Sequence, residues 1–486
     1  MAVSDQVATT SSRARFRLQA LSSPVALLAL ALILRLVFLA LAGINAPLAG
    51  DEIQYQQLAA NVAAGRGFVQ NNNPFFPGQV LYAWQAPLYP LSLAVLYFFF
   101  GPHTIVAKLF GILIGVATVY VTYDLAWRVF SNRRAAWLAG LGVAIYPGLL
   151  TNAHLLLSET LDTFLLVLAF DLLSAAISPL QTGHRKKGLV LSALAGATWG
   201  AATLTRGLTL YFVAPLAVWL IAVWVYQEGH WRIPGRHQLT APLAGLGIFV
   251  AAMTIVIAPW TLRNYAVFHQ LVTLETKGGV NFWLGNSPYT PSDFIRNVWK
   301  VEVRGPMLAV LPQAEVTRDH AAYALGLAYI ESAPLTFIAR IPVKFADFWG
   351  FERNLVDAAE ATRQGKSGGW NSPSKIGADL ISDGAYVLLV LLAIGGLVLA
   401  PDDRWKLLLG GFLAYFVMAH IVVFGDGRFH FPLIPFLALY AAWPIAAWPK
   451  IVWGRGRQVT ALAAALVFVL VWGHELAAAW ATLTLR

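Results

Sequence analysis

Three acidic residues stand beside long apolar segments, where charged side chains are costly unless they serve a function. Asp51 and Glu52 follow the first apolar segment in "GDEIQYQQLA", and Glu159 opens a later one in "SETLD". A carboxylate at a helix end can take a proton from a hydroxyl or an amine, so all three residues are candidate catalytic bases. The sequence also allows structural roles, as an N-cap for Asp51 and as a helix-dipole partner for Glu159.

Basic residues stand at the ends of several apolar segments, as in "TLTRGL", "APWTLRNY" and "FGDGRFHFPLIP". Interface snorkelling would explain any one arginine there. However, a guanidinium binds phosphate through two parallel hydrogen bonds and stays charged, so several arginines together favour an anionic ligand. The predicted phosphate-binding residues are Arg206, Arg263, Lys277, Arg428 and His430.

The sequence does not predict a metal site or a cofactor. Cysteine is absent, and His154, His269, His320 and His430 lack the spacing of metal ligands. A divalent metal stays possible without support from any motif. There is no Walker motif and no Gly-x-Gly-x-x-Gly after a strand, so a nucleotide site of the Rossmann type is not expected.

Composition indicates a membrane protein. Of 486 residues 58% are hydrophobic and 12% are charged, against about 25% charged in soluble chains. The net charge of +10 would allow nucleic-acid binding. Here, however, the basic residues gather in short connectors between apolar segments, as the positive-inside rule expects. We therefore predict a multi-pass inner-membrane protein that contacts membrane lipid and no nucleic acid.

Apolar segments near the ~20 residues that cross a bilayer recur along most of the chain. The fold prediction is an all-α polytopic membrane protein with about eleven transmembrane helices, in a range of eleven to thirteen. The predicted spans are Pro24–Ala42, Thr104–Phe130, Ala135–Leu150, Thr160–Ile177, Leu189–Thr205, Leu208–Tyr226, Ala241–Leu262, Gly384–Ala400, Leu407–Phe424, Phe431–Trp448 and Thr460–Trp480.

Charge then orients these spans. Arg13, Arg15 and Arg17 keep the N-terminus in the cytoplasm, and later basic connectors also fall inside if Pro87–Gly101 lies on the surface instead of crossing. Asp51–Ala64 is expected to form a helix before it, and Pro334–Trp349 another surface helix. The predicted organisation is a cytoplasmic tail (1–23), a transmembrane core (24–262) with a first external loop (45–101), an external loop domain (263–383) and C-terminal spans (384–486).

With these motifs in order, the chain resembles the polyprenyl-phosphate-dependent membrane glycosyltransferases of the protein O-mannosyltransferase type, which include the lipid A aminoarabinose transferase and have the GT-C fold. The segments that carry the resemblance are "GDEIQYQQLA", "QAPLYPLSLAVLYFFFG", "SNRR", "SETL", "LTRG", "APWTLRNYAVF", "GGVNFWLGNSP" and "GRFHFPLIPFLALYAA".

The resemblance implies a specific reaction and specific residues. The family's catalytic carboxylate corresponds to Asp51, and a second acidic position corresponds to Glu159, where the lipid A enzymes carry Asp. Those enzymes have Lys where Gln85 stands here, which argues against that particular substrate. Polar residues within the motifs are expected to bind substrate: Tyr55, Gln85, Asn281 and Asn286.

The sequence thus favours a glycosyltransferase that moves a sugar from a polyprenyl-phosphate donor to a lipid, glycan or protein acceptor at the periplasmic face. A transporter or flippase of a lipid-linked or anionic substrate is the alternative. It would place more ionisable residues in mid-span than Arg35, Lys108, Asp124 and Asp171. An O-antigen polymerase or ligase would also use lipid-linked sugars, but would lack the acidic pair after the first span.

Overall fold

The computed structural model describes most of the chain. The described residues are 23–42, 47–227, 230–231, 236–291, 298, 300–352, 373–448 and 454–484. Arg13, Arg15 and Arg17 of the predicted cytoplasmic tail lie outside them.

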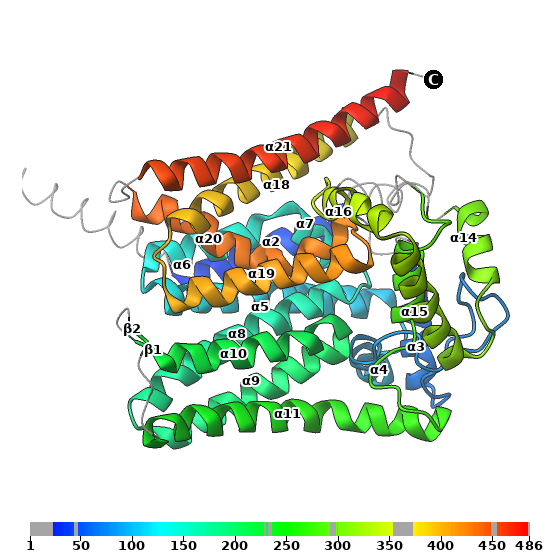
Figure 1. The fold of residues 1–486 in the computed structure, drawn as a ribbon, viewed down its shortest axis with the longest axis horizontal. Helices are drawn as coiled ribbons and strands as arrows, with labels where there is room; N and C mark the ends of the chain where they lie inside the picture. Colours follow the sequence, from blue (N-terminus) through cyan, green and yellow to red (C-terminus); the bar gives the residue numbers. More distant parts are fainter. Residues whose placement is uncertain are drawn as a thin grey trace, which may run out of the picture.

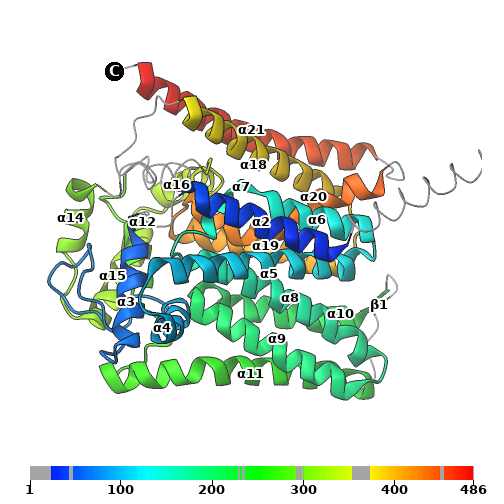
Figure 2. The same cartoon turned by 180° about the vertical axis from the view of Figure 1, so that it is seen from behind.

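Long apolar helices form a bundle with nearly parallel axes (Figure 1). They are α2 (Pro24–Ala42), α5 (Thr104–Phe130), α8 (Glu159–Gln181), α9 (Arg185–Thr205), α11 (Arg236–Phe268), α18 (Pro373–Leu399), α19 (Arg404–Val423), α20 (Ile434–Ala447) and α21 (Arg455–Thr484). The view from behind shows the same arrangement, with α18 and α21 side by side along one edge (Figure 2).

In the described part of the chain, nine helices are long and apolar enough to cross a membrane, or ten if one bent pair counts as a single span. The prediction of eleven spans was too high by this criterion. Predicted span Ala135–Leu150 is interrupted, because Pro147 cannot continue the helix that ends at Ile145. Predicted span Leu208–Tyr226 begins with a 3₁₀ segment, which leaves a helix of only 13 residues.

These interrupted segments still run along the bundle (Figure 1). The first forms α6 (Arg133–Ile145) and α7 (Pro147–Asn152), and the second forms η1 (Gly207–Phe212) and α10 (Val213–Val225). A two-stranded antiparallel hairpin follows α10, with β1 (Tyr226–Gln227) paired to β2 (His230–Trp231). A further 3₁₀ segment, η2 (Gly427–Leu433), leads into α20.

Short helices gather at one end of the bundle, at the right of Figure 1. They are α3 (Asp51–Ala63), α4 (Leu88–Phe100), α12 (Gly278–Gly285), α14 (Val301–Ala309), α15 (Glu315–Ser332) and α16 (Pro334–Phe348). We call this the capped end. The 13 residues of α4 are too few to cross a bilayer, and α15 and α16 form the bent pair, with an angle of 108° between them.

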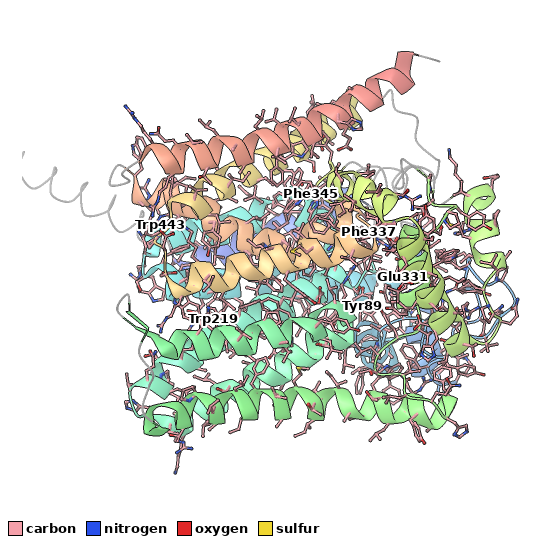
Figure 3. The ribbon with its side chains drawn as sticks, in the orientation of Figure 1. Tyr89, Trp219, Glu331, Phe337, Phe345 and Trp443 are labelled. Atoms are coloured by element: carbon pink, nitrogen blue, oxygen red, sulfur yellow. The ribbon has the colours of Figure 1, made fainter. Side chains whose placement is uncertain are left out.

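The two ends of the bundle differ in charge. Helices α6, α9 and α19 begin at the end opposite the capped end (Figure 1), and each starts with a basic residue, Arg133, Arg185 or Arg404. Helix α21 finishes at the capped end. Trp219 and Trp443 lie toward the basic end, whereas Tyr89 and Glu331 lie toward the capped end (Figure 3).

Close contacts hold the bundle together. A Cβ on Gly196 of α9 would collide with the carbonyl oxygen of Phe249 on α11, so glycine lets these two helices touch. The fully buried Trp199 packs edge-on against Phe170, with ring centroids 5.4 Å apart, and its indole Nε1 donates to the carbonyl of Thr209 at 3.0 Å. This bond fixes η1 to the end of α9, beside the cavity described next.

Candidate active site

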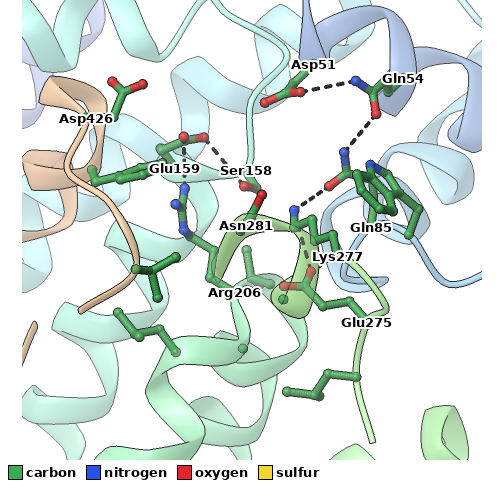
Figure 4. A pocket seen from close by; sticks show the side chains of 18 of the residues that line it. Asp51, Gln54, Gln85, Ser158, Glu159, Arg206, Glu275, Lys277, Asn281 and Asp426 are labelled. Atoms are coloured by element: carbon green, nitrogen blue, oxygen red, sulfur yellow. Dashed lines mark hydrogen bonds and ion pairs between the residues drawn. The ribbon is translucent and has the colours of Figure 1, made fainter. Parts of the chain in front are cut away.

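A cavity of ≈ 790 Å³ opens between the bundle and the short helices of the capped end. Its wall combines the start of α3 and α8, the ends of α9 and α19, the segment before α12, and η2. Nine of the predicted site residues line it: Asp51, Glu52, Tyr55, Gln85, Glu159, Arg206, Lys277, Asn281 and Arg428. Figure 4 shows carboxylates and cations from these separate elements facing one another.

Asp51 is the first residue of α3 and not its N-cap. Gly50 holds the N-cap position with a positive φ of 54°, a backbone conformation that favours glycine, and no side chain caps the helix. The Asp51 carboxylate faces the cavity instead. Its Oδ2 accepts from Nη1 of Arg428 at 2.9 Å, and its Oδ1 accepts from Nε2 of Gln54 at 3.2 Å.

The charge around Asp51 keeps it ionised. Burial raises the pKa of this carboxyl, but the nearby charges of Arg428, Lys277 and Arg206 oppose it and hold the pKa below its ordinary value. Asp51 is therefore a carboxylate at any physiological pH, as a base must be before it accepts a proton.

Glu159 and the two arginines form a second cluster beside Asp51. Glu159 is the first residue of α8, and its Oε1 lies 2.8 Å from Nη1 of Arg206 and 3.9 Å from Nε of Arg428. Both guanidiniums also lie over the ring of Phe429, at 5.0 and 5.4 Å from its centroid. Two fixed cations thus share one edge of the cavity with a buried carboxylate.

Lys277 supplies a third cation from the segment before α12. Its Nζ donates to Oε1 of Gln85 at 2.6 Å and lies 3.5 Å from Oε2 of Glu275. Burial lowers the pKa of Lys277, but Glu275, Tyr55 and Asp51 outweigh it and raise the pKa above its ordinary value. The ammonium stays charged, and its shortest contact is to a neutral amide.

Glu52 turns away from its neighbour Asp51 and binds backbone. Its Oε2 accepts from the N–H of Ala49 at 3.1 Å, and its Oε1 accepts from the N–H of Leu156 at 2.9 Å. Burial raises the pKa of Glu52. This carboxylate joins the start of α3 to the segment before α8, and so places Asp51 beside Glu159.

Three predicted residues lie outside the cavity wall. Arg263 donates to the carbonyls of Tyr82 and Phe68 at 2.7 and 3.1 Å. It therefore fastens the first loop to α11. Asn286 donates to the carbonyl of Val422 at 3.0 Å and accepts from the buried Lys344.

His430 is the third of these residues, and it is fully buried. Its Nδ1 lies 2.9 Å from the carbonyl oxygen of Phe348, and its Nε2 lies 2.9 Å from Oε1 of Glu352. The ring stacks on Tyr386 at a centroid distance of 4.9 Å. These contacts join η2 to α16 and α18.

The cavity wall also contains residues that the sequence did not single out: Gln54, Glu275, Asp319, His420 and Asp426. Asp426 was visible in "FGDGRFHF", next to Arg428. Its side chain accepts from the backbone N–H of Arg428 at 3.1 Å, and burial raises its pKa. Gln54 gave no signal because it is a neutral residue in an amphipathic segment. His420 did carry one that the sequence prediction overlooked, since it is the one acidic or basic residue within the predicted span Leu407–Phe424.

The described residues contain no group of three or more His, Asp or Glu side chains arranged to hold a metal ion. Two carboxylates of the cavity instead pair with arginine, Glu159 with Arg206 at 2.8 Å and Asp51 with Arg428 at 2.9 Å.

A sequence profile of dolichyl-phosphate-mannose-protein mannosyltransferases matches residues 28–274, slightly more than half of the chain. The chain belongs to this family. The matched segment contains Asp51, Glu159 and Arg206. No curated protein sequence matches the chain.

Solved structures show the fold of this mannosyltransferase-family chain. It is similar to the archaeal oligosaccharyltransferase AglB from Archaeoglobus fulgidus in complex with an inhibitory peptide and a dolichol-phosphate, with 15% identity and a TM-score of 0.54 over 92% of this chain and 54% of that one. A crystal structure of the Archaeoglobus fulgidus oligosaccharyltransferase with Zn and sulfate gives 16% identity and a TM-score of 0.53, over 92% and 52%.

The chain therefore spans about half the length of these oligosaccharyltransferases. ArnT from Cupriavidus metallidurans bound to undecaprenyl phosphate matches with 16% identity and a TM-score of 0.42, over 87% of this chain and 78% of that one. The likeness to the oligosaccharyltransferases establishes a GT-C-like fold, as the sequence predicted.

Proposed function

We propose that this chain transfers a glycosyl group from a polyprenyl-phosphate-linked donor to a lipid, glycan or protein acceptor, with inversion at the anomeric carbon. The observation that carries the proposal is the meeting of an ionised Asp51 with Arg428, Arg206 and Lys277 in one cavity at the capped end. This reaction needs a base that takes the proton of the acceptor and cations that stabilise the departing phosphate.

In the proposed reaction, an oxygen or nitrogen of the acceptor attacks the anomeric carbon. A new bond forms there while the bond from that carbon to the phosphate oxygen breaks. The acceptor proton passes to the Asp51 carboxylate, and the bonding electrons leave with the polyprenyl phosphate. Asp51 is suited to this role because it lies in the cavity wall and is held ionised by its neighbours.

The developing negative charge of the leaving group needs fixed cations. Lys277 is the best suited to this role, because its shortest bond is to the neutral amide of Gln85 and not to a carboxylate. Arg206 and Arg428 are already oriented by Glu159 and are held over Phe429. Guanidiniums held in this way need little rearrangement before they bind phosphate.

The remaining predicted residues have supporting roles in this proposal. Tyr55 donates to Oγ of Ser158 at 3.2 Å, beside Glu159, and Asn281 lies in the wall near Lys277, so both can contact substrate hydroxyls. Arg263, Asn286 and His430 act through the backbone segments that they join, since none of them lines the cavity.

We further propose that the capped end faces the periplasm of the inner membrane and that the N-terminus faces the cytoplasm. Support comes from Arg133, Arg185 and Arg404, which begin helices at the opposite end. The cavity would then meet donor that has already been moved across the membrane. Enzymatic reporters fused after Arg486 test this, since a reporter active only in the cytoplasm should stay inactive there.

The test of the activity is direct. Purified protein is incubated with a panel of polyprenyl-phosphate monosaccharides and candidate acceptors, and release of free polyprenyl phosphate is followed by mass spectrometry. The proposal expects acceptor-dependent release with at least one sugar. Absence of release across the panel, by protein that is folded and binds polyprenyl phosphate, would contradict it.

A further inference from the structure

A row of side-chain amides connects the proposed phosphate-binding lysine to the proposed base. Nζ of Lys277 donates to Oε1 of Gln85 at 2.6 Å, Nε2 of Gln85 donates to Oε1 of Gln54 at 3.0 Å, and Nε2 of Gln54 donates to Oδ1 of Asp51 at 3.2 Å. Figure 4 shows the row crossing the cavity wall from Lys277 to Asp51. We call it the amide relay.

The chemistry at both ends fixes the direction of every bond in the relay. The Asp51 carboxylate can only accept, so Gln54 must present its NH₂ group to it. Gln54 then offers its oxygen to Gln85, which must present NH₂ in turn. The oxygen of Gln85 is left facing Lys277, and an ammonium can only donate. No amide in the row can be flipped without placing two donors or two acceptors against each other.

The surroundings hold the relay in this arrangement. Gln54 and Gln85 are each only 3% exposed, and a buried amide without partners is costly. Gln70 donates a second hydrogen bond to Oε1 of Gln54 at 2.8 Å, which fixes that oxygen further. Hydrogen bonds that point the same way polarise one another, and the low dielectric of a buried site strengthens them.

From this geometry we propose that Gln54 and Gln85 are positioning residues that hold the Asp51 carboxylate for proton transfer and couple it to Lys277. The inference rests on the proposed function for the roles of Asp51 and Lys277. Gln54 fixes one oxygen of Asp51 and Arg428 fixes the other, so the plane of the base is set before substrate arrives. A phosphate drawn to Lys277 changes the charge at the far end of the row, and thus the bond at Asp51.

Three variants test the coupling. Gln54→Met removes the donor to Asp51, and Gln85→Met removes both bonds of the central amide at similar size and without a new charge. Gln85→Glu keeps an acceptor for Lys277 but cannot donate to Gln54. Each is expected to lower kcat about 10- to 100-fold, the usual cost of a hydrogen bond to a charged group. Gln56→Met, on the same helix but outside the relay, should keep normal turnover.

Two readouts separate a relay from independent contacts. In a relay, the double variant Gln54→Met/Gln85→Met is no slower than the slower single variant, because either change breaks the same row. Two separate substrate contacts would instead multiply their losses. A Gln85→Glu variant with normal kcat would overturn the relay, because that change preserves only the contact with Lys277.

A third readout does not depend on transfer. The titration of Asp51 is followed by infrared spectroscopy. The signal is the band of the protonated carboxyl group that the unaltered protein shows and Asp51→Asn lacks. Gln54→Met removes the donor to the carboxylate, and Gln85→Met removes the bond that polarises this donor. Both changes should move the midpoint to higher pH. An unchanged midpoint in both variants would refute the relay even if the enzyme transfers sugar. A shifted midpoint in protein without transfer would support the relay and count against the proposed function.

Discussion

Replacing Arg428 by methionine should slow transfer and change its pH dependence. The guanidinium lies 2.9 Å from Oδ2 of Asp51 and 3.9 Å from both Glu159 and Asp426. Without it, burial would raise the pKa of Asp51 with one fewer opposing charge. The base would then begin to protonate, and activity would begin to fall, at a higher pH than in the unaltered enzyme.

The expected loss of activity in Arg428→Met follows from the geometry of this charge pair. Truncating one member of a buried, hydrogen-bonded charge pair costs ~2–5 kcal/mol. The side chains of Arg428 and Asp51 are 29% and 30% exposed, so partial solvent screening favours the lower part of that range. A loss of roughly 2–3 kcal/mol corresponds to about a 30- to 160-fold lower kcat/KM.

The assay is the initial rate of carrier release over about pH 4 to 9, with donor below its KM. Arg428→Lys is the matched control, because it keeps the charge and should retain more activity than Arg428→Met. If Arg428→Met shows the same rate and the same acid limb as the unaltered protein, Arg428 does not set the state of Asp51 and has no part in leaving-group stabilisation.

Three further predictions use the same geometry. Because the pKa of Asp51 is held below its ordinary value, the base stays ionised as pH falls, and the rate should change little between about pH 5 and 8; an acid limb within that window in the unaltered enzyme would contradict this. Glu315→Ala should lower the free energy of unfolding by ~2–4 kcal/mol, because its carboxylate accepts from the N–H groups of Tyr82 and Ala83 and from the hydroxyl of Thr276; the exposed Glu331→Ala is the control in the same denaturant titration. His430→Ala should lower the unfolding temperature and kcat with little change in donor KM, because His430 does not line the cavity itself but joins η2 to α16 and to Glu352 of the cavity wall; a selective rise in donor KM would instead indicate direct contact with phosphate.

Much of the site could be predicted from where charged residues stand in the sequence. Asp51, Glu159, Arg206 and Arg428 all stand at the ends of apolar segments. In a bundle whose helices run between the same two ends, such residues reach one end together, and the structure places these four in one cavity. The same reasoning could not show which oxygen faces which guanidinium.

The contacts of Arg263 and His430 could not be predicted from their positions in the sequence. Both also follow or begin apolar segments, yet their side chains bond to the carbonyls of Tyr82 and Phe348. Those partners are remote in sequence, and only the path of the loops brings them near. Neutral Gln54 carried no charge signal at all, although it contacts Asp51 directly.

The number of membrane spans was overestimated because two apolar segments contain local breaks. Ala135–Leu150 and Leu208–Tyr226 are apolar enough to suggest crossings, but hydropathy does not register a break in a helix. Pro147 ends α6 after 13 residues, and the 3₁₀ segment η1 shortens α10. Buried Arg35 donates to the carbonyl of Ala144 near that break, a contact that hydropathy alone does not reveal.

The most direct test of the proposed reaction compares the unaltered enzyme with Asp51→Asn, with mass spectrometry of both the released polyprenyl phosphate and the glycosylated acceptor. Asparagine keeps the size of the side chain and can still bond to Arg428, but it cannot take up the acceptor proton. Transfer should fall at least ~10²-fold, while the unfolding temperature and donor binding stay close to those of the unaltered protein. Near-normal transfer by a stable Asp51→Asn protein would contradict the assignment of Asp51 as the base.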